Sequence, residues 1–326
     1  MKRFLIFVSI FICLQDVAAQ MTQHIIGPLP AYNGSHANTK IPYLLYTPLE
    51  VRNGQDDPNE KFPVIIALHG IGERTDQYST MASVSTGDLV DMYTTGLPTL
   101  YQTSTSAMAG RKFAAPGRPT SEAQEFYVYA PQVWQGHSYF YHIYGDAMLD
   151  EIAKNPKADL TRVYIIGLSF GGGGVLVWLQ DRNLSDRIAG AVALCAGYYR
   201  YAWQSPAGSD YPNFCNWGGL LIMGHSANDD VTNRRDNSLP LDTLTNPGSF
   251  YSDRAYDSLV NHKDCKTTVI YHKWTTGGHN VWYRWMHPNN FGLSYRVITQ
   301  FNASLGTLNN IYSLLLTRKS VKRRTD

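Results

Sequence analysis

Short apolar runs recur along the chain, and stretches with helical periodicity separate several of them. Many of these runs are continuous rather than alternating, which is typical of strands buried on both faces. This order predicts an α/β fold, in which helices cover both faces of a mostly parallel central sheet. The predicted strands are Pro42–Tyr46, Val64–Leu68, Phe126–Ala130, Val163–Gly167, Ala189–Leu194, Leu220–Met223 and Thr267–Tyr271. The predicted helices are Phe140–Lys154, Gly173–Gln180, Tyr251–Asn261 and Ser294–Leu316, the last broken near Gly306.

The first 19 residues have the features of a signal peptide. Lys2 and Arg3 precede an apolar run from Phe4 to Leu14, and small residues follow where a signal peptidase cleaves. The run is shorter than the roughly 17–25 residues of a membrane-spanning helix, so we favour a cleaved signal over an uncleaved anchor. We therefore expect a secreted or periplasmic protein without a stable membrane anchor.

The rest of the chain suits one domain. Residues 20–317 have the length of a single α/β domain. Periodicity is lost near 74–124, where Gly and Pro recur, and this stretch is either a functional lid or a disordered, solvated loop. The basic residues of 318–326 are expected to form a solvated tail.

Charge and composition exclude few classes of binding partner. The formal net charge of +2 argues against a nucleic-acid partner. Aromatic residues make up 13% of the chain, which fits a protein that binds sugars or aryl groups, although a large core explains them equally well. Nothing in the sequence indicates the oligomeric state.

The sharpest chemical signal is the segment RVYIIGLSFGGGG at 162–174. A β-branched strand runs into Gly167-Leu168-Ser169-Phe170-Gly171, and a helical pattern follows. This is the G-x-S-x-G motif in the strand–turn–helix context of a nucleophile elbow. Glycine is required at both ends because side chains there would collide in so tight a turn. The motif predicts Ser169 as a nucleophile.

A serine nucleophile needs a base, and the base needs an acid that orients it. His279 stands in KWTTGGHNVW (273–282), after the last predicted strand, where two glycines allow a close approach to the elbow. Asp229 and Asp230 follow the strand at Leu220–Met223 and are both candidates for the acid. Asp236 and Asp242 lie farther from the strand end and are better explained as surface acids. The order Ser, Asp, His is the one that the α/β-hydrolase fold uses.

Four segments together resemble a known group of proteins. The sequence is similar to the secreted esterases related to polyhydroxybutyrate depolymerases and feruloyl esterases, a group that includes predicted peptidases. The resemblance covers roughly residues 43–285 and implies the α/β-hydrolase fold. It rests on IIALHGIGER (65–74), YAPQ (129–132), RVYIIGLSFGG (162–172) and the GGHNVW loop (277–282).

The resemblance also implies roles for individual residues. Aligning NDDV (228–231) with the G-x-x-D-x-x-V loop of that group places the acid on Asp229. One extra residue precedes the aspartates and Thr-Asn replaces the usual Val-Pro, so Asp230 stays open. The oxyanion donors implied are the backbone N–H of Ile71 or Gly72 and that of Phe170, while His69 holds their loop as a structural residue.

The sequence indicates the type of reaction more clearly than it indicates the substrate that donates the acyl group. The sequence contains no HExxH, phosphate loop or dinucleotide motif, so neither a metal nor a cofactor is expected. Tyr199 and Trp203, on either side of Arg200 in GYYRYAW (197–203), and Trp282 are candidate substrate-binding residues; packing of a lid explains them equally well. We expect a serine carboxylic ester hydrolase, with aryl esters and feruloylated or acetylated plant polysaccharides as candidate substrates. The alternatives are a serine peptidase and a non-catalytic carbohydrate-binding protein of the same fold.

Three cysteines follow the predicted signal peptide. Cys195 ends a strand and should lie at the catalytic edge of the sheet. Cys215 and Cys265 each precede a strand and should lie at the opposite edge, within the roughly 4.4–6.8 Å between Cα atoms that a disulfide requires. This placement predicts a Cys215–Cys265 disulfide with Cys195 free, and the main rival is Cys195–Cys215.

Overall fold

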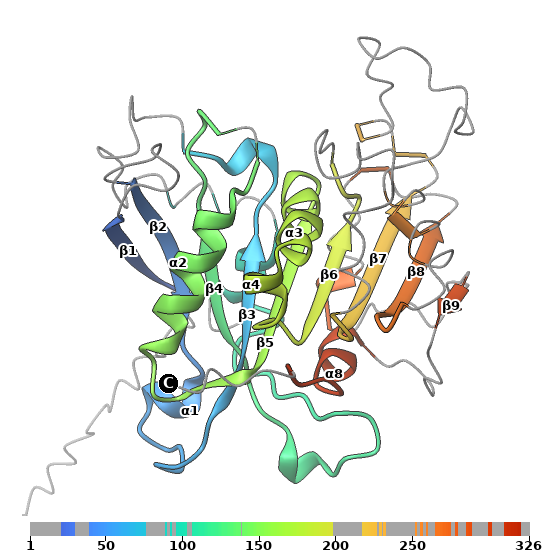
Figure 1. Cartoon of the computed structure of the whole chain (residues 1–326). Coiled ribbons are helices and arrows are strands. Elements are labelled where there is room, and N and C mark those ends of the chain that lie inside the picture. The colour runs from blue at the N-terminus through green and yellow to red at the C-terminus, as the bar shows by residue number, and fades with distance from the viewer. Residues whose placement is uncertain are drawn as a thin grey trace, which may run out of the picture.

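The protein forms one nine-stranded sheet with helices on both faces, seen in a computed structural model (Figure 1). The strand order is β1-β2-β4-β3-β5-β6-β7-β8-β9. The six strands from β4 to β8 in this order run parallel, and β1, β2 and β9 are antiparallel to their neighbours. The structure describes residues 21–29, 39–75, 96–102, 106–137, 139–197, 217–226, 265–274 and 310–320, and positions 89, 92, 228, 229, 231, 232, 252, 255, 256, 259, 278, 279, 285–288 and 299–301.

The elements alternate between strands and helices, as the sequence predicts. The strands are β1 Thr22–Leu29, β2 Thr39–Tyr46, β3 Phe62–Leu68, β4 Tyr127–Pro131, β5 Ala158–Leu168, β6 Gly190–Leu194, β7 Leu220–Ser226, β8 Thr268–Trp274 and β9 Thr299–Phe301. The helices are α1 Leu49–Arg52, α2 His142–Ala153, α3 Phe170–Gln180, α4 Arg182–Ser185 and α8 Ile311–Leu315, with 3₁₀ turns at Ile71–Glu73, Leu97–Tyr101 and Thr120–Glu122. Every strand predicted from an apolar run is present.

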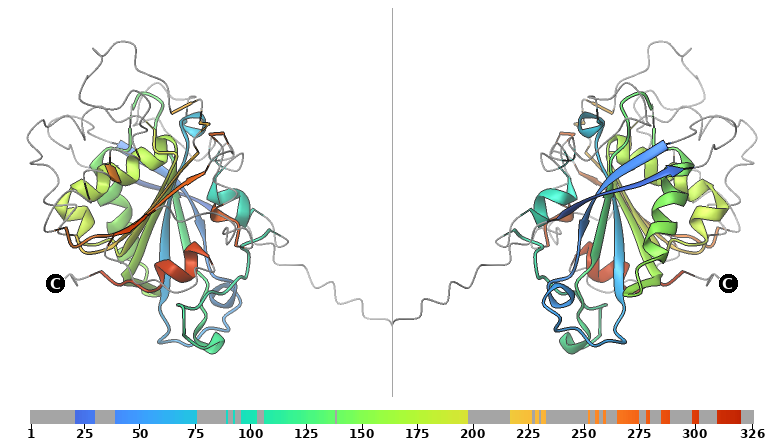
Figure 2. Two further views of the ribbon diagram at one scale, coloured as in Figure 1. Left: turned by 90° about the vertical axis from the view of Figure 1, so that its right-hand side faces the viewer. Right: turned by 90° about the vertical axis from the view of Figure 1, so that its left-hand side faces the viewer.

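Two apolar cores lie on the two faces of the sheet. Alternate residues of a strand point to opposite faces, so Val163 and Ile165 of β5 join one core while Tyr164 and Ile166 join the other. Helices α2, α3 and α4 cover the first face, and α8 with the segment around 97–113 covers the second (Figure 2). Burial on both faces explains why the central strands read as continuous apolar runs.

The C-terminal part departs from the prediction in two places, of which the predicted helix is wrong. A helix over Ser294–Leu316 was expected, but Thr299–Phe301 forms β9, which pairs antiparallel with β8 as an edge strand, and the helix α8 is confined to Ile311–Leu315. The basic tail is not wholly solvated. The Tyr164 hydroxyl donates to the Arg318 carbonyl at 2.8 Å, and the Ser320 N–H donates to the Thr161 carbonyl at 2.8 Å. The start of the tail is therefore bound along β5.

The described residues of the stretch near 74–124 include several that are buried rather than solvated. Among them are Leu97, Tyr101, Met108 and Phe113, all at most 4% exposed and all in the second core. Apolar residues at irregular spacing pack here without the periodicity of a helix or strand, which is why the sequence pattern does not reveal them.

Within the described residues, no helix is long and apolar enough to cross a membrane.

The two described cysteines lie at the expected edges of the sheet. Cys195 directly follows β6, is free and fully buried, and donates its backbone N–H to the Gly224 carbonyl of β7. Cys265 is buried just before β8 starts, at the opposite edge. Cys215 lies outside the described residues, so the pairing stays a prediction.

We expect proteolytic mapping without reduction to release a peptide pair that joins Cys215 to Cys265. The disulfide would close a loop of about 50 residues and stabilise the fold by about 4 kcal/mol in the chain-entropy model. Reduction should therefore lower the midpoint of thermal unfolding. A fragment that joins Cys195 to Cys215 would contradict the argument from sheet edges.

Candidate active site

The carboxyl ends of β5, β7 and β8 bring the predicted catalytic loops to one edge of the sheet. Leu168, Leu194 and Gly224 align across β5, β6 and β7. Ser169 follows β5 directly, Asp229 follows β7, and His279 comes after β8. Loops at this edge carry the functional residues of parallel sheets, because every strand ends there.

Ser169 occupies a strained turn between β5 and α3. Its φ of 56° and ψ of −116° lie where few non-glycine residues are found. The turn is held by backbone bonds: Ser169 N–H donates to the Leu194 carbonyl at 2.9 Å, and its own carbonyl accepts from Gly173 and Gly197. The serine side chain stands at the N-terminus of α3, where the helix dipole favours negative charge.

The two motif glycines are required by close backbone approaches. A Cβ at Gly167 would lie 2.2 Å from the Gly171 carbonyl oxygen, and one at Gly171 would lie 2.2 Å from that of Leu68. Both contacts are with backbone atoms that cannot turn aside. The collision expected from the sequence is thereby confirmed.

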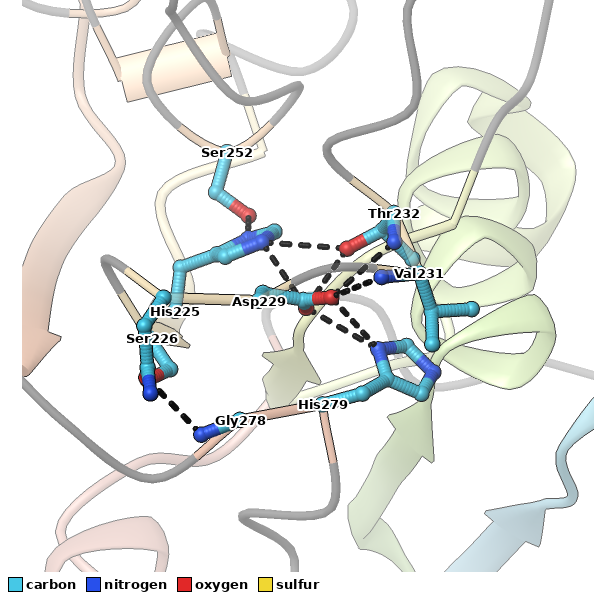
Figure 3. Close-up of polar contacts among 9 residues, drawn as sticks. His225, Ser226, Asp229, Val231, Thr232, Ser252, Gly278 and His279 are labelled. Atoms are coloured by element: carbon cyan, nitrogen blue, oxygen red, sulfur yellow. Dashed lines mark hydrogen bonds and ion pairs between the residues drawn. The ribbon is translucent and has the colours of Figure 1, made fainter.

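Asp229 and His279 form a hydrogen-bonded pair (Figure 3). His279 Nδ1 lies 2.9 Å from Asp229 Oδ2 and 3.1 Å from Oδ1. The Asp229 carboxylate is 1% exposed and also accepts from the N–H groups of Val231 and Thr232. Burial alone would raise the pKa of Asp229, but hydrogen bonds from His225, His279 and Thr232 outweigh it and hold the pKa well below its usual range. The carboxylate is therefore ionised at any working pH.

Asn228 fixes the histidine loop to the aspartate loop. Its Oδ1 accepts from the Ser226 hydroxyl at 2.6 Å and from the Gly278 N–H at 2.9 Å. Gly278 directly precedes His279, so this bond fixes the position of the backbone that carries the imidazole. In the part of the chain that the structure describes, Ser169 makes no side-chain hydrogen bond to His279; in free enzymes such bonds are often long and tighten with substrate.

His69 has a structural role in the loop after β3. The Val133 N–H donates to His69 Nε2 at 2.9 Å, so the ring proton is on Nδ1, which donates to the Gly70 carbonyl at 2.6 Å. Both ring nitrogens are thus used, Nδ1 within the loop and Nε2 to the segment that follows β4. Burial lowers the pKa of His69 to about 4, and the ring stays neutral at working pH.

The loop that His69 begins is tied down on both sides. The buried Glu73 accepts from the Gly70 N–H at 2.7 Å, and Arg74 donates to the carbonyls of Ile71, Gln135 and His137. The Arg74 guanidinium lies over the Phe170 ring, 5.6 Å from its centroid. Glu73 and Arg74 therefore shape this loop.

The backbone N–H groups of Ile71, Gly72 and Phe170 donate to no described residue. All three are at the edge where Ser169 lies, and Phe170 is the first residue of α3. An N–H at a helix start, like those of a tight turn, is suited to hold an oxyanion. Their positions fit the role that the sequence resemblance implies.

The depressed pKa of His69 predicts a pH-dependent stability. Between its ordinary pKa of 6.5 and about 4, the unfolded chain binds more protons than the folded chain, so stability falls as the pH falls through this window. Each such histidine contributes a slope of at most about 1.4 kcal/mol per pH unit, and the buried His272, whose pKa is also lowered to about 4, adds to it.

Urea unfolding at pH 7.5 and pH 5 measures this effect. We expect a lower midpoint at pH 5, and a smaller drop between the two pH values in the His69→Gln variant. Equal drops in the variant and the parent would show that His69 titrates normally in the folded chain.

The structure shows a second cluster of side chains at Asp229, which the sequence analysis did not predict. The ligand atoms of Cys195, His225 and Asp229 lie within 4.8 Å of one another, and all three residues are buried. Such a set suits Zn²⁺ only if the thiol is ionised. Burial, followed by the Asp229 carboxylate, raises the pKa of the Cys195 thiol well above its ordinary value. In the metal-free chain the thiol is therefore protonated and hydrogen-bonds to Asp229.

Several predicted residues lie outside the described residues. They are Tyr199, Trp203 and Trp282 of the expected substrate rim, together with the intervening Arg200, and Asp230, the rival for the acid. Of the two aspartates considered, Asp229 is the one whose contacts with His279 are seen.

Comparison with known proteins bears on the fold. No protein-family model matches the sequence, and no curated protein matches it. A solved structure of a thermostable esterase superposes on 92% of this chain with a TM-score of 0.51 and 14% identity, and the chain covers 63% of it. The chain has the α/β-hydrolase fold.

Two further solved structures give lower TM-scores. A putative dipeptidyl aminopeptidase IV from Bacteroides ovatus gives a TM-score of 0.42 and 17% identity over 81% of this chain and 33% of its own. A ferulic acid esterase gives 0.44 and 16% over 84% of this chain and 97% of its own. The chain thus spans less than two thirds of the esterase and of the aminopeptidase. At such identities the likeness concerns the fold alone.

Proposed function

We propose that the protein is a serine carboxylic ester hydrolase, with Ser169 as nucleophile, His279 as general base and Asp229 as the acid that orients it. One observation carries the proposal. At a single edge of the sheet, a serine is held at positive φ, and a histidine is bonded through Nδ1 to a buried carboxylate. A strained serine turn gives no advantage to a protein that only binds its ligand, whereas a nucleophile elbow depends on this strain.

The proposed reaction proceeds through an acyl-enzyme. His279 Nε2 takes the Ser169 proton as Oγ attacks the ester carbonyl, and the imidazolium is stabilised by Asp229. The oxyanion is held by the N–H of Phe170 and that of Ile71 or Gly72, each donor worth about 10²–10³-fold in rate. The imidazolium then protonates the leaving alcohol. Water, activated by the same histidine, releases the acid and restores Ser169.

A substrate panel tests the reaction class. It contains p-nitrophenyl acetate and butyrate, methyl ferulate, acetylated xylan and a peptide amide. We expect turnover of the short esters, and we propose aryl esters or feruloylated and acetylated polysaccharides as the natural class because of the sequence resemblance. Cleavage of the amide alone would favour a peptidase, and no turnover of any substrate would favour a carbohydrate-binding protein.

The proposed chemistry requires no metal. We expect EDTA to leave kcat/KM for p-nitrophenyl butyrate unchanged, because every step uses groups of the chain. Activity that disappears in EDTA and returns with added Zn²⁺ would contradict this, and would point to the cluster at Cys195.

We also propose that the protein is exported and loses residues 1–19. Lys2, Arg3 and the short apolar run support the proposal. Expression of the full chain in a host with a secretion pathway, followed by N-terminal sequencing of the product, tests it. A product that begins at Met1 and stays with the membrane fraction would favour an uncleaved anchor.

A further inference from the structure

A second imidazole contacts the proposed catalytic aspartate. His225, in β7, is fully buried, and its Nε2 lies 3.1 Å from Asp229 Oδ2. His279 approaches the same oxygen at 2.9 Å. Figure 3 shows Asp229 between the two rings. The proposed reaction assigns no role to His225.

The number of hydrogens on each group determines which one donates in the hydrogen bond between His225 Nε2 and Asp229 Oδ2. Thr232 Oγ1 has one hydrogen, which it donates to Asp229 Oδ2 at 2.7 Å. Thr232 Oγ1 is also 3.1 Å from His225 Nε2, and there it is left only as an acceptor. His225 Nε2 therefore carries a hydrogen, directed at Thr232 Oγ1 and Asp229 Oδ2. His225 is a donor to the carboxylate.

The other side of the His225 ring is fixed as well. Its Nδ1 lies 2.9 Å from Ser252 Oγ, and Ser252 is fully buried. With the proton on Nε2, Nδ1 of the neutral ring accepts from the Ser252 hydroxyl. A chain of hydrogen bonds thus runs from Ser252 through His225 to Asp229 and on to His279.

This chain places the carboxylate. Oδ1 accepts from the backbone at Val231 and Thr232, and Oδ2 accepts from the Thr232 hydroxyl and His225. The backbone bonds fix one oxygen, and the bonds to Oδ2 fix the rotation of the carboxylate about it. Without His225, that buried oxygen loses a donor and the carboxylate becomes freer to turn away from His279.

We propose that His225 is a positioning residue for the hydrolysis, donating Nε2–H to Asp229 Oδ2 so that the carboxylate keeps the orientation in which it accepts from His279. The inference rests on the proposed function and deepens it. A positioning residue affects the chemical step, so its loss lowers kcat and leaves KM nearly unchanged.

The test compares His225→Leu with His225→Gln. Leucine removes the donor, whereas glutamine offers an N–H at about the distance of Nε2. We expect kcat for p-nitrophenyl butyrate to fall roughly 10- to 100-fold in H225L, the effect of losing one hydrogen bond to a charged group, and to recover in large part in H225Q. His272→Leu, which removes another buried histidine from the adjoining strand, is the control and should keep the parent kcat.

A double variant separates positioning from a general structural effect. Because His225 acts through Asp229, adding H225L to Asp229→Asn should cost little beyond D229N alone. A full additional loss would overturn the proposal, and so would an H225L variant with the parent kcat. If H225L does not fold, Ser252→Ala decides: it should lower kcat modestly at constant KM, and an unchanged kcat would overturn the proposal. An active Ser169→Ala variant would instead contradict the proposed function itself.

Discussion

Ser169→Ala is expected to lower kcat for p-nitrophenyl butyrate by about 10⁶-fold, the loss seen when other triads lose their nucleophile. Without Oγ no acyl-enzyme forms, and what remains is the contribution of the oxyanion donors and of binding. Alanine at φ 56° keeps the strain of the turn but removes no backbone bond, because the turn is held by the N–H and carbonyl of residue 169. The fold should therefore stay intact, with an unfolding midpoint close to that of the parent.

The matched control is Ser185→Ala. Ser185 is also buried, at the end of α4 and far from the catalytic edge, and its hydroxyl makes only a long 3.5 Å bond to the Arg182 carbonyl. Its loss should leave kcat unchanged. A folded S169A protein that keeps a tenth of the parent activity would remove Ser169 from the nucleophile role.

The central part of the fold follows from local patterns in the sequence. Strands such as β3 and β5 are buried on both faces, so their apolar runs are unbroken and easily recognised. The edge strands β1 and β9 were missed because edges are exposed or short: five residues of β1 are exposed, and β9 has three residues. Helix periodicity in Ser294–Leu316 was overridden at β9 by pairing with β8, a contact that local pattern cannot reveal.

The site was predictable to the extent that its residues stand in motifs. Ser169 is set by an elbow of fixed spacing, and Asp229 and His279 follow from the order of loops after strands. His225 and Asn228 stand in no such motif, since their roles depend on tertiary contacts: His225 bonds to Ser252, and Asn228 to Gly278, fifty positions away. One signal was available: a histidine within a wholly buried strand, four residues before the candidate acid, is a polar group that must find a partner.

Asp229→Asn is expected to lower kcat by about 10⁴-fold while KM changes little. An amide at this position can donate to His279 Nδ1, which favours the tautomer with hydrogen on Nε2. In that tautomer the imidazole cannot take the Ser169 proton. The amide oxygen can still accept from Val231 and Thr232, so the loop should keep its shape and the variant should fold.

Asp230→Asn is the natural control, because it makes the same chemical change one residue away and leaves Asp229 in place. Its kcat should stay within a few-fold of the parent, since the contacts seen with His279 come from Asp229. Circular dichroism and thermal unfolding of both variants separate a catalytic loss from a folding defect. The reverse result, with D230N inactive and D229N active, would place the acid on Asp230, and the hydrogen-bond chain through His225 would then have no catalytic carboxylate to position.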